Sequence, residues 1–314
     1  MSNVPVLLHA PENLADAIGH WVRHVPAHAA LVSGAETLSY EGLLSRARDV
    51  AAGFSSVGVG AGNVICLQLP LSAAFVVALV GIEQLGAVAA PLPTELIAYG
   101  VERYLKMIRP AAVCCPQPDE TLDCCDLIEE LASSSVPIHH RIVDGTPPNA
   151  LWTNFESLHR HGAFALERDL VFLSEPMGES PFVLRPPLAP ELQQHVLALS
   201  VERISQEGRA MAQMLALDTG DVVLCLLEPS NPIGLSAVLA SLISGSTLAI
   251  GAPGEPQVSG ATALVASRAQ LRSLLDSHAP DATPALRTIL VSDGTPEDDT
   301  LERVATFWPD CNVR

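Results

Sequence analysis

The chain alternates short apolar runs with longer amphipathic segments. In the first half the apolar runs predict strands at residues 30–32, 37–40, 64–70, 87–92, 111–115 and 140–143. The segments with helical periodicity predict helices at residues 14–25, 41–57, 72–85, 94–108 and 119–133. Short, continuously apolar strands that alternate with helices are typical of parallel sheets covered on both faces. The pattern therefore predicts an α/β fold.

The second half repeats this alternation after a break. Residues 145–168 contain a Pro-Pro pair, Asn and other polar residues, and residues 186–194 resemble an inserted loop. The expected strands are 222–227, 247–250, 263–266 and 288–291, and the expected helices are 199–217, 234–244, 268–278 and 297–307. This break predicts two α/β subdomains, 1–165 and 166–314.

Charge and hydropathy narrow the classes of partner. The net charge of the 314 residues is −18, which opposes general affinity for nucleic acid or an anionic membrane. No apolar run reaches the ~18 to 20 residues of a membrane span. The N-terminal residues MSNVPVLLHAPENL lack the basic region and long apolar run of a secretory signal, so we expect a cytoplasmic location.

Cysteine, histidine and lysine offer few candidates for chemistry. Of the seven cysteines, the adjacent pairs Cys114-Cys115 and Cys124-Cys125 lack the C-x-x-C spacing of metal sites. We expect reduced, mostly buried thiols, scattered surface histidines and no metal. Lys106 is the single lysine, and we expect it to be a solvated charge on a helix.

Several motifs in order resemble the N-terminal region of the adenylate-forming superfamily. The first half contains TLSYEGLL, GVGAGNVICLQLP, FVVALVGI and GAVAAPL, and the second contains LDTGDVVLCLLEPSNPIGLSAVLASLISGSTLAI and LRTILVSDGTPEDDTLERVATFWPDCNVR. The superfamily includes acyl- and aryl-CoA synthetases, nonribosomal peptide synthetase adenylation domains and luciferases. The resemblance implies two Rossmann-like α/β subdomains with largely parallel sheets, without the family's C-terminal domain.

The position of the family's phosphate loop is degenerate. That loop resembles [Y]-T-S-G-[ST]-T-G-x-P-K-G, and it offers backbone N–H groups, hydroxyls and a lysine to the ATP phosphates. With Pro181 as the anchor, this chain has LSEPMGESPFV, which includes Ser174, Glu175 and Gly178 and places Phe182 at the lysine position. Carboxylates in such a loop repel phosphate. The resemblance therefore implies that ATP and Mg²⁺ binding is lost and that no cofactor remains.

A second landmark is the family's P-x-F-H-x-x-G turn, which lines the acyl pocket. The matching EPSNPIG places Ser230 at the aromatic position and Asn231 at the histidine position, and it retains Gly234. These three residues are the candidate substrate pocket.

The third landmark is the adenine-proximal turn, which is often G-G-A-P in the family. In the matching SDGTP, the residues Asp293, Gly294 and Thr295 are a candidate adenine turn. The alternative is a structural β-to-α turn with Asp293 or Thr295 near a helix cap.

The missing parts of the family pattern suggest a function without catalysis. The aromatic-Gly-x-Thr-Glu motif, the ribose-binding aspartate and the C-terminal adenylation lysine do not occur within the 314 residues. We expect a catalytically inactive adenylation-like domain, a binding or interaction module of a polyketide, nonribosomal peptide or acyl-activating system. The alternative is the N-terminal part of an acyl- or aryl-acid ligase that works only with the missing parts.

The expected partner is another domain or protein of a biosynthetic assembly, or a second copy of the chain. The absent segments should leave apolar surface open near Val304, Phe307, Trp308 and Val313 and along the helix 234–244. Neither nucleic acid nor membrane is expected.

Overall fold

The computed structural model describes residues 13–34, 36–95, 98–118, 123–158, 181–185, 196–251, 260–277 and 285–314. The chain forms two compact units. One is the contiguous unit, Leu44–Ile204, and the other is the split unit, which combines Met1–Leu43 with Ser205–Arg314. Each unit contains one seven-stranded sheet.

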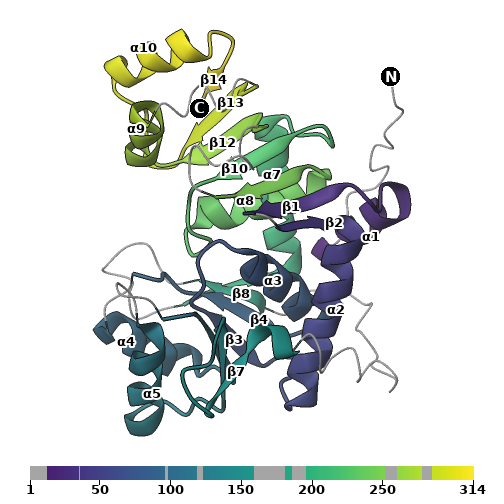
Figure 1. Ribbon diagram of the computed structural model, residues 1–314, viewed down its shortest axis with the longest axis vertical. Helices are drawn as coiled ribbons and strands as arrows, with labels where there is room; N and C mark the ends of the chain where they lie inside the picture. Colours follow the sequence, from purple (N-terminus) through teal and green to yellow (C-terminus); the bar gives the residue numbers. More distant parts are fainter. Residues whose placement is uncertain are drawn as a thin grey trace. The chain divides into compact units, whose positions relative to one another are not determined.

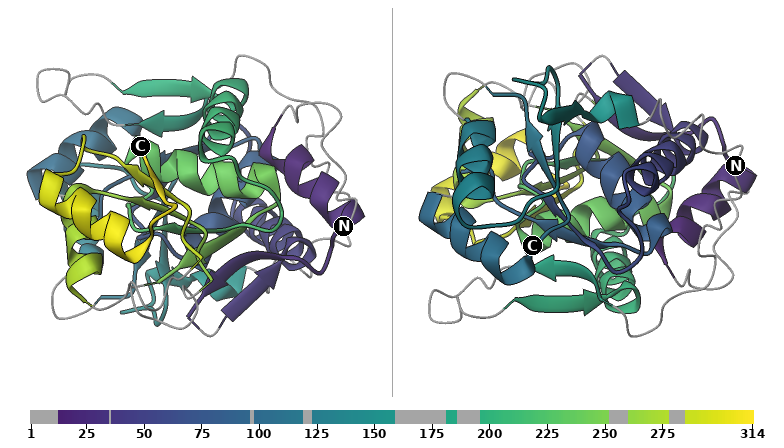
Figure 2. Two further views of the ribbon diagram at one scale, coloured as in Figure 1. Left: turned by 90° about the horizontal axis from the view of Figure 1, so that it is seen from above. Right: turned by 90° about the horizontal axis from the view of Figure 1, so that it is seen from below.

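The sheet of the contiguous unit has the order β7-β6-β5-β3-β4-β8-β9. Figure 1 labels four of these strands, β3, β4, β7 and β8. Its neighbouring strands are parallel except for the antiparallel pair β8 and β9, whose arrows lie side by side in Figure 2. The strands are β3 (Val64–Leu67), β4 (Val88–Pro91), β5 (Ala112–Pro116), β6 (His140–Asp144), β7 (Trp152–Asn154), β8 (Pro181–Arg185) and β9 (Leu197–Ser200). Its helices include α3 (Ala73–Leu85), α4 (Ala98–Ile108), α5 (Cys124–Ser134) and most of α2 (Tyr40–Ser56).

Local sequence explains why α3 begins and ends where it does. The Ser72 side chain accepts a hydrogen bond from the Phe75 backbone N–H at 3.2 Å, and Gly86 ends the helix with φ 68°. Inside the helix, a Cβ at Gly81 would lie 2.7 Å from the carbonyl oxygen of Ala47 on α2. Glycine therefore allows α2 and α3 to approach closely.

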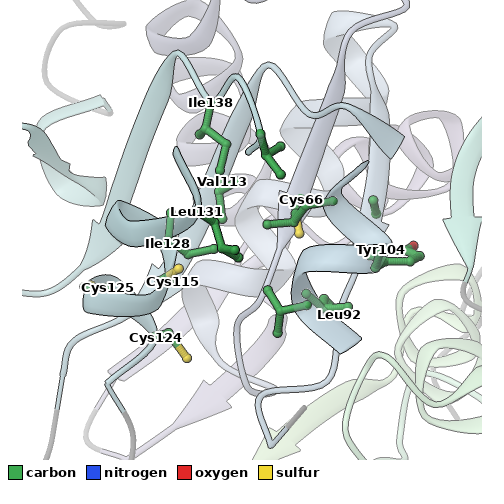
Figure 3. Close-up of a cluster of buried hydrophobic side chains, with 14 of the residues drawn as sticks. Cys66, Leu92, Tyr104, Val113, Cys115, Cys124, Cys125, Ile128, Leu131 and Ile138 are labelled. Carbon is green, nitrogen blue, oxygen red and sulfur yellow. The ribbon is translucent and has the colours of Figure 1, made fainter. Parts of the chain in front are cut away.

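The core of the contiguous unit includes side chains from β3, α4, β5 and α5 (Figure 3). Cys66, Tyr104 and Cys115 belong to this cluster, and each of them is buried. The Tyr104 hydroxyl donates to the Leu184 carbonyl oxygen at 3.0 Å, which ties α4 to β8. Burial of a phenol is tolerated because its O–H group has this partner.

The sheet of the split unit has the order β14-β13-β12-β10-β11-β1-β2, parallel except for the antiparallel pair β1 and β2. Its strands are β1 (Ala29–Ser33), β2 (Glu36–Ser39), β10 (Val222–Cys225), β11 (Thr247–Ile250), β12 (Ala263–Ala266), β13 (Thr288–Val291) and β14 (Asn312–Val313). The helices are α1 (Leu14–His24), α8 (Pro232–Ser244), α9 (Arg268–Asp276), α10 (Asp298–Phe307) and most of α7 (Val201–Leu215).

The strand pairing differs from the expected division into 1–165 and 166–314. The hairpin β1–β2 joins the sheet of the later strands, and the hairpin β8–β9 joins the sheet of the earlier ones. Each hairpin runs directly into a helix that crosses the unit boundary four residues from its start, α2 in one case and α7 in the other. Linear composition marks the break at 145–168 but carries no information on these long-range pairings.

The predicted elements are otherwise confirmed, with shifts at their ends. The helices expected at 94–108 and 119–133 begin later, at Ala98 and Cys124. The sequence did not predict β7, β8, β9 or β14. The first two residues of the helix expected at 199–217 belong to β9, and α7 begins at Val201. In the described part of the chain, no helix is long and apolar enough to cross a membrane.

The expectation of open apolar surface is wrong for most of its residues. Helix α8 is buried continuously from Gly234 to Ile243. On α1, the Trp21 indole N–H donates to the Ile243 carbonyl oxygen at 3.1 Å. A Cβ at Gly208 of α7 would lie 2.8 Å from the Ile243 side chain. Helices α1 and α7 therefore cover α8, so its apolar side chains are not open to solvent.

The C-terminal apolar residues are also mostly buried. Val304 and Trp308 belong to a core cluster that includes residues of α9 and β13. Val313 is partly buried against the same cluster, and Phe307 is exposed. The apolar surface predicted to contact a neighbouring domain or a second copy is therefore mostly covered by the chain itself.

Candidate functional site

The residues predicted for the substrate pocket and the adenine turn lie at one edge of the split unit's sheet. The parallel strands β10, β12 and β13 are neighbours, and they end at Cys225, Ala266 and Val291. Ligands of open α/β sheets bind beyond the carboxyl ends of the strands. This carboxyl edge is therefore the candidate site.

The three pocket candidates make contacts within the loop after β10 and the first turn of α8. The Asn231 side chain accepts a hydrogen bond from the Ile233 backbone N–H at 2.9 Å and caps the helix. The Ser230 hydroxyl donates to a Glu228 carboxylate oxygen at 3.1 Å. A Cβ at Gly234 would approach the Glu228 carbonyl oxygen too closely. Each of these residues therefore has a role in the local structure.

The candidate adenine turn contacts a neighbouring helix. Asp293 Oδ1 accepts a hydrogen bond from the Arg268 backbone N–H at 2.7 Å, and Asp293 Oδ2 lies 3.7 Å from Arg268 Nε. Asp293 therefore caps α9, whereas Glu297 at the start of α10 makes no side-chain cap hydrogen bond. Gly294 has φ 109°, a conformation that glycine permits, and Thr295 is exposed. These contacts are those of a structural turn.

A capping box at the start of α9 links this helix to the end of β10. The Ser267 hydroxyl accepts from the Gln270 N–H at 3.2 Å, and Gln270 Oε1 accepts from the Ser267 N–H at 2.9 Å. Gln270 Nε2 donates to the Leu226 carbonyl oxygen at 2.6 Å. The sequence contains the S-x-x-Q pattern of a capping box, but the contact between Gln270 and Leu226 can be identified only in the folded structure.

These contacts reduce the number of backbone N–H groups with which the carboxyl edge could bind an anion. Helix N-termini bind phosphate through free backbone N–H groups. At α8 and α9 some of these groups already donate to Asn231, Ser267 and Asp293. Asp298 and Asp299 occupy the first turn of α10 and add negative charge. A phosphate would have to displace internal partners or approach carboxylates.

Phe182, at the position of the family's phosphate-binding lysine, lies in β8 of the contiguous unit. Its side chain is 2% exposed. The next residue, Val183, pairs with Ala89 of β4 and with Leu199 of β9, so this part of β8 lies within the sheet. The other loop positions, Ser174, Glu175 and Gly178, lie outside the described residues.

The single lysine is exposed, as predicted. Lys106 Nζ lies 2.7 Å from Glu102 Oε1, one turn earlier on α4. The hydrogen bond and the positive charge of Lys106 lower the pKa of the Glu102 carboxyl. This is an ordinary surface ion pair of a helix.

The cysteines are free thiols, and six of the seven are buried. Burial raises the pKa of the Cys225 thiol and of the Cys125 thiol to about 12. A thiol held protonated is a poor nucleophile. Among the described residues, no three His, Cys, Asp or Glu side chains are placed to hold a metal ion.

Two mostly parallel sheets, each with an antiparallel hairpin at one edge, define the N-terminal α/β domain of adenylate-forming enzymes. The chain belongs to the AMP-binding enzyme family, whose sequence model matches residues 18–184. That match includes the degenerate loop positions 173–183.

Relatives agree with this assignment. The chain is 27% identical over 307 residues to "Novobiocin biosynthesis protein H" of Streptomyces niveus, covering 92% of this chain and 46% of that protein. It therefore spans less than half the length of this curated relative.

Solved structures show the same fold. A putative long-chain-fatty-acid CoA ligase from Rhodopseudomonas palustris matches with a TM-score of 0.82 at 18% identity, over 96% of this chain and 74% of that one. A long-chain-fatty-acid-CoA ligase from Archaeoglobus fulgidus matches with a TM-score of 0.81 at 13% identity, over 100% of this chain and 65% of that one.

Proposed function

We propose that this chain is a catalytically inactive adenylation-like domain that acts as a binding or interaction module. The observation that carries the proposal is the burial of Phe182, at the lysine position, in the sheet of the contiguous unit. An apolar core side chain offers no charge to a phosphate. The position is used for packing, and a lysine there would have to leave the core to reach a ligand.

The carboxyl edge of the split unit supports the same proposal. Asn231 stands at the histidine position of the family's acyl-pocket turn, and Asp293 at the first glycine of its adenine turn. Each accepts a hydrogen bond from a backbone N–H of this chain. The resulting contacts stabilise two helix starts without a ligand. A domain that keeps the fold but uses its site residues for capping fits a binding role better than carboxylate activation.

We place the module in a biosynthetic system for polyketides, nonribosomal peptides or other activated acids. The similarity to a protein of novobiocin biosynthesis supports this context. Its partner is then another protein or domain of the same assembly.

Calorimetry with ATP and Mg²⁺ tests the loss of nucleotide binding. We expect no dissociation constant below ~1 mM, because Phe182 stands at the lysine position, Pro176 has no backbone N–H, and Glu175 adds a charge that repels phosphate. A dissociation constant in the micromolar range would overturn the proposal. Pyrophosphate exchange with fatty, aryl and amino acids should remain at the level without enzyme.

The second candidate is the N-terminal part of an acyl- or aryl-acid ligase. The family match over residues 18–184 and the 46% coverage of the curated relative favour it. Addition of the remaining C-terminal part of that relative tests it. Acid-dependent pyrophosphate exchange that requires both parts would support the ligase and exclude the inactive module.

A further inference from the structure

The amide side chain of Gln68 is buried, and its oxygen atom lacks a hydrogen-bond donor. Gln68 directly follows β3 and is 1% exposed. Its Nε2 donates to the Pro93 carbonyl oxygen at 3.4 Å, whereas its Oε1 has no hydrogen-bond partner among the described residues. A buried acceptor that stays unpaired lowers the free energy of unfolding, so its presence in a folded core requires an explanation.

Gln68 lies at the point of the sheet where two connections diverge. The chain runs from β3 through α3 to β4, and in the opposite direction along the sheet from β5 through α5 to β6. Because such crossovers are right-handed, α3 and α5 lie on opposite faces of the sheet. The Gln68 backbone N–H donates to the Cys114 carbonyl oxygen at 2.9 Å between β3 and β5. Open α/β sheets bind ligands at such a point, beyond the carboxyl ends of the strands.

The surroundings of the Gln68 amide favour a neutral ligand with an apolar part. Cys66 and Leu92 belong to the buried apolar cluster on the face of α4 and α5 (Figure 3). Alternate residues of a strand point to the same face, so Gln68 continues the face that Cys66 begins. On either side of the three central strands, β6 and β8 end in charges of opposite sign, Asp144 and Arg185. This pair of charges favours neither an anion nor a cation.

The split unit has an apolar residue at the equivalent position. The backbone N–H of Leu226, directly after β10, donates to β12 in the same register in which Gln68 donates to β5. Leu226 packs against the apolar cluster of its unit, and its carbonyl oxygen accepts from Gln270 Nε2 at 2.6 Å. The chain itself therefore fills this point of the split unit. Since the fold does not require a polar side chain here, the amide of Gln68 has a different reason.

We propose that Gln68 is the binding residue of a site for a small neutral molecule that donates a hydroxyl or amide hydrogen. The O–H or N–H group of this ligand donates to Gln68 Oε1, and its apolar part contacts the face of α4 and α5. The site includes no position of the phosphate loop and none of the turns of the split unit. Binding of ATP would therefore refute the proposed function and leave this site intact.

An alcohol and its isomeric ether test whether the site recognises a hydrogen-bond donor. Butan-1-ol and methyl propyl ether contain the same atoms, but only the alcohol can donate. Titration of the whole chain, followed through the NMR resonances of the Gln68 side-chain amide, should give a dissociation constant of about 1–10 mM for the alcohol. Acetamide and N,N-dimethylacetamide make the same comparison for an amide N–H donor. Equal shifts with donor and non-donor, or no shift with any of the four compounds, would overturn the site.

Two substitutions of Gln68 distinguish a ligand site from a fixed water molecule. Gln68→Met keeps the length of the side chain and removes the acceptor, and Gln68→Leu introduces the residue of the split unit. Each should abolish the alcohol titration, read from neighbouring backbone resonances. Each should also raise the melting temperature of the free protein by about 2–6 °C, because no buried acceptor stays unpaired. If both variants melted at a lower temperature, Oε1 would already have a partner in the free protein, and the proposal would be overturned.

Gln84→Met is the matched control for these variants. Gln84 is 8% exposed near the C-terminal end of α3, and its Oε1 also lacks a partner among the described residues. Removal of this second acceptor should leave the butan-1-ol titration at Gln68 unchanged. Loss of the titration in Gln84→Met as well would show that the alcohol acts on the protein generally, and it would overturn the assignment of the site to Gln68.

Discussion

Replacement of Phe182 by lysine restores the residue that the family uses at this position, and we expect it to destabilise the protein without creating an ATP site. The side chain is 2% exposed, and β8 lies between β4 and β9. A lysine there must either bury its ammonium group or pull its strand away from the sheet. Either change lowers the free energy of unfolding.

The magnitude follows from burial. Truncation of a buried phenylalanine costs about 3–5 kcal/mol. The aliphatic stem of lysine recovers part of this loss, but desolvation of its charge adds a cost of similar size. We therefore expect Phe182→Lys to lower the free energy of unfolding by about 3–5 kcal/mol.

Urea denaturation followed by circular dichroism measures this change, and calorimetry tests for ATP binding. Leu197→Lys is the matched control, because Leu197 is 53% exposed on the neighbouring strand β9. The control should stay within about 0.5 kcal/mol of the unmodified protein. If Phe182→Lys were equally harmless, or bound ATP in the micromolar range, the assignment of this position to the core would be refuted.

Four further predictions concern stability and reactivity. In urea titrations, Asp221→Ala should lower the free energy of unfolding by about 2 kcal/mol, because the buried Asp221 carboxylate contacts Arg287 through both oxygens. Arg287→Lys should lower the free energy of unfolding by less. In the native protein at pH 8, a thiol reagent should modify Cys311 first, because the other six cysteines are buried. The rate of this modification should rise about tenfold per pH unit, since burial raises the pKa of the Cys311 thiol to about 11. A second thiol that reacts equally fast would contradict this. Burial also raises the pKa of five other thiols above the value of an unfolded cysteine. The free energy of unfolding should therefore be constant below pH ~9 and fall above it, by up to about 1.4 kcal/mol per thiol per pH unit. Urea midpoints measured as a function of pH test this. The segment Leu44–Ile204 should unfold cooperatively when produced alone, because it contains a whole sheet, and the segment 1–165, which lacks β8 and β9, should not.

The sequence predicted the central parallel strands well because their signal is local. Strands such as β3 and β13 are continuous apolar runs, and buried parallel strands have this composition in any order of the sheet. The burial of α8 was not predictable in the same way. Its apolar residues indicate a buried helix, but its cover includes α1, which lies more than two hundred residues earlier.

The sequence placed each candidate turn directly after a strand, but it did not predict the contacts of these turns. The turns after β10 and β13 follow strands that end at one edge of the sheet. The partner of Asp293 is on α9, not on the α10 helix that its own turn precedes. Such a contact depends on which strands are neighbours, and no local pattern encodes it.

The equivalence of the two sheets gives an independent reason to assign Asn231 a structural role. Strands β3 and β10 occupy the same place in their sheets, and each leads through a short loop to a buried helix. In the contiguous unit the residue before that helix is Ser72, which caps α3 as Asn231 caps α8. Glycines end both helices, at φ 68° and 79°. Ser72 lies outside the three site motifs considered above, so helix capping alone is a sufficient reason for a short polar residue at this point of the fold. Asn231 therefore needs no ligand to explain it, and an Asn231→Ser variant should keep the stability of α8 within about 0.5 kcal/mol, whereas Asn231→Ala should lose about 1 kcal/mol. Equal losses for both variants would show that Asn231 does something that a cap does not.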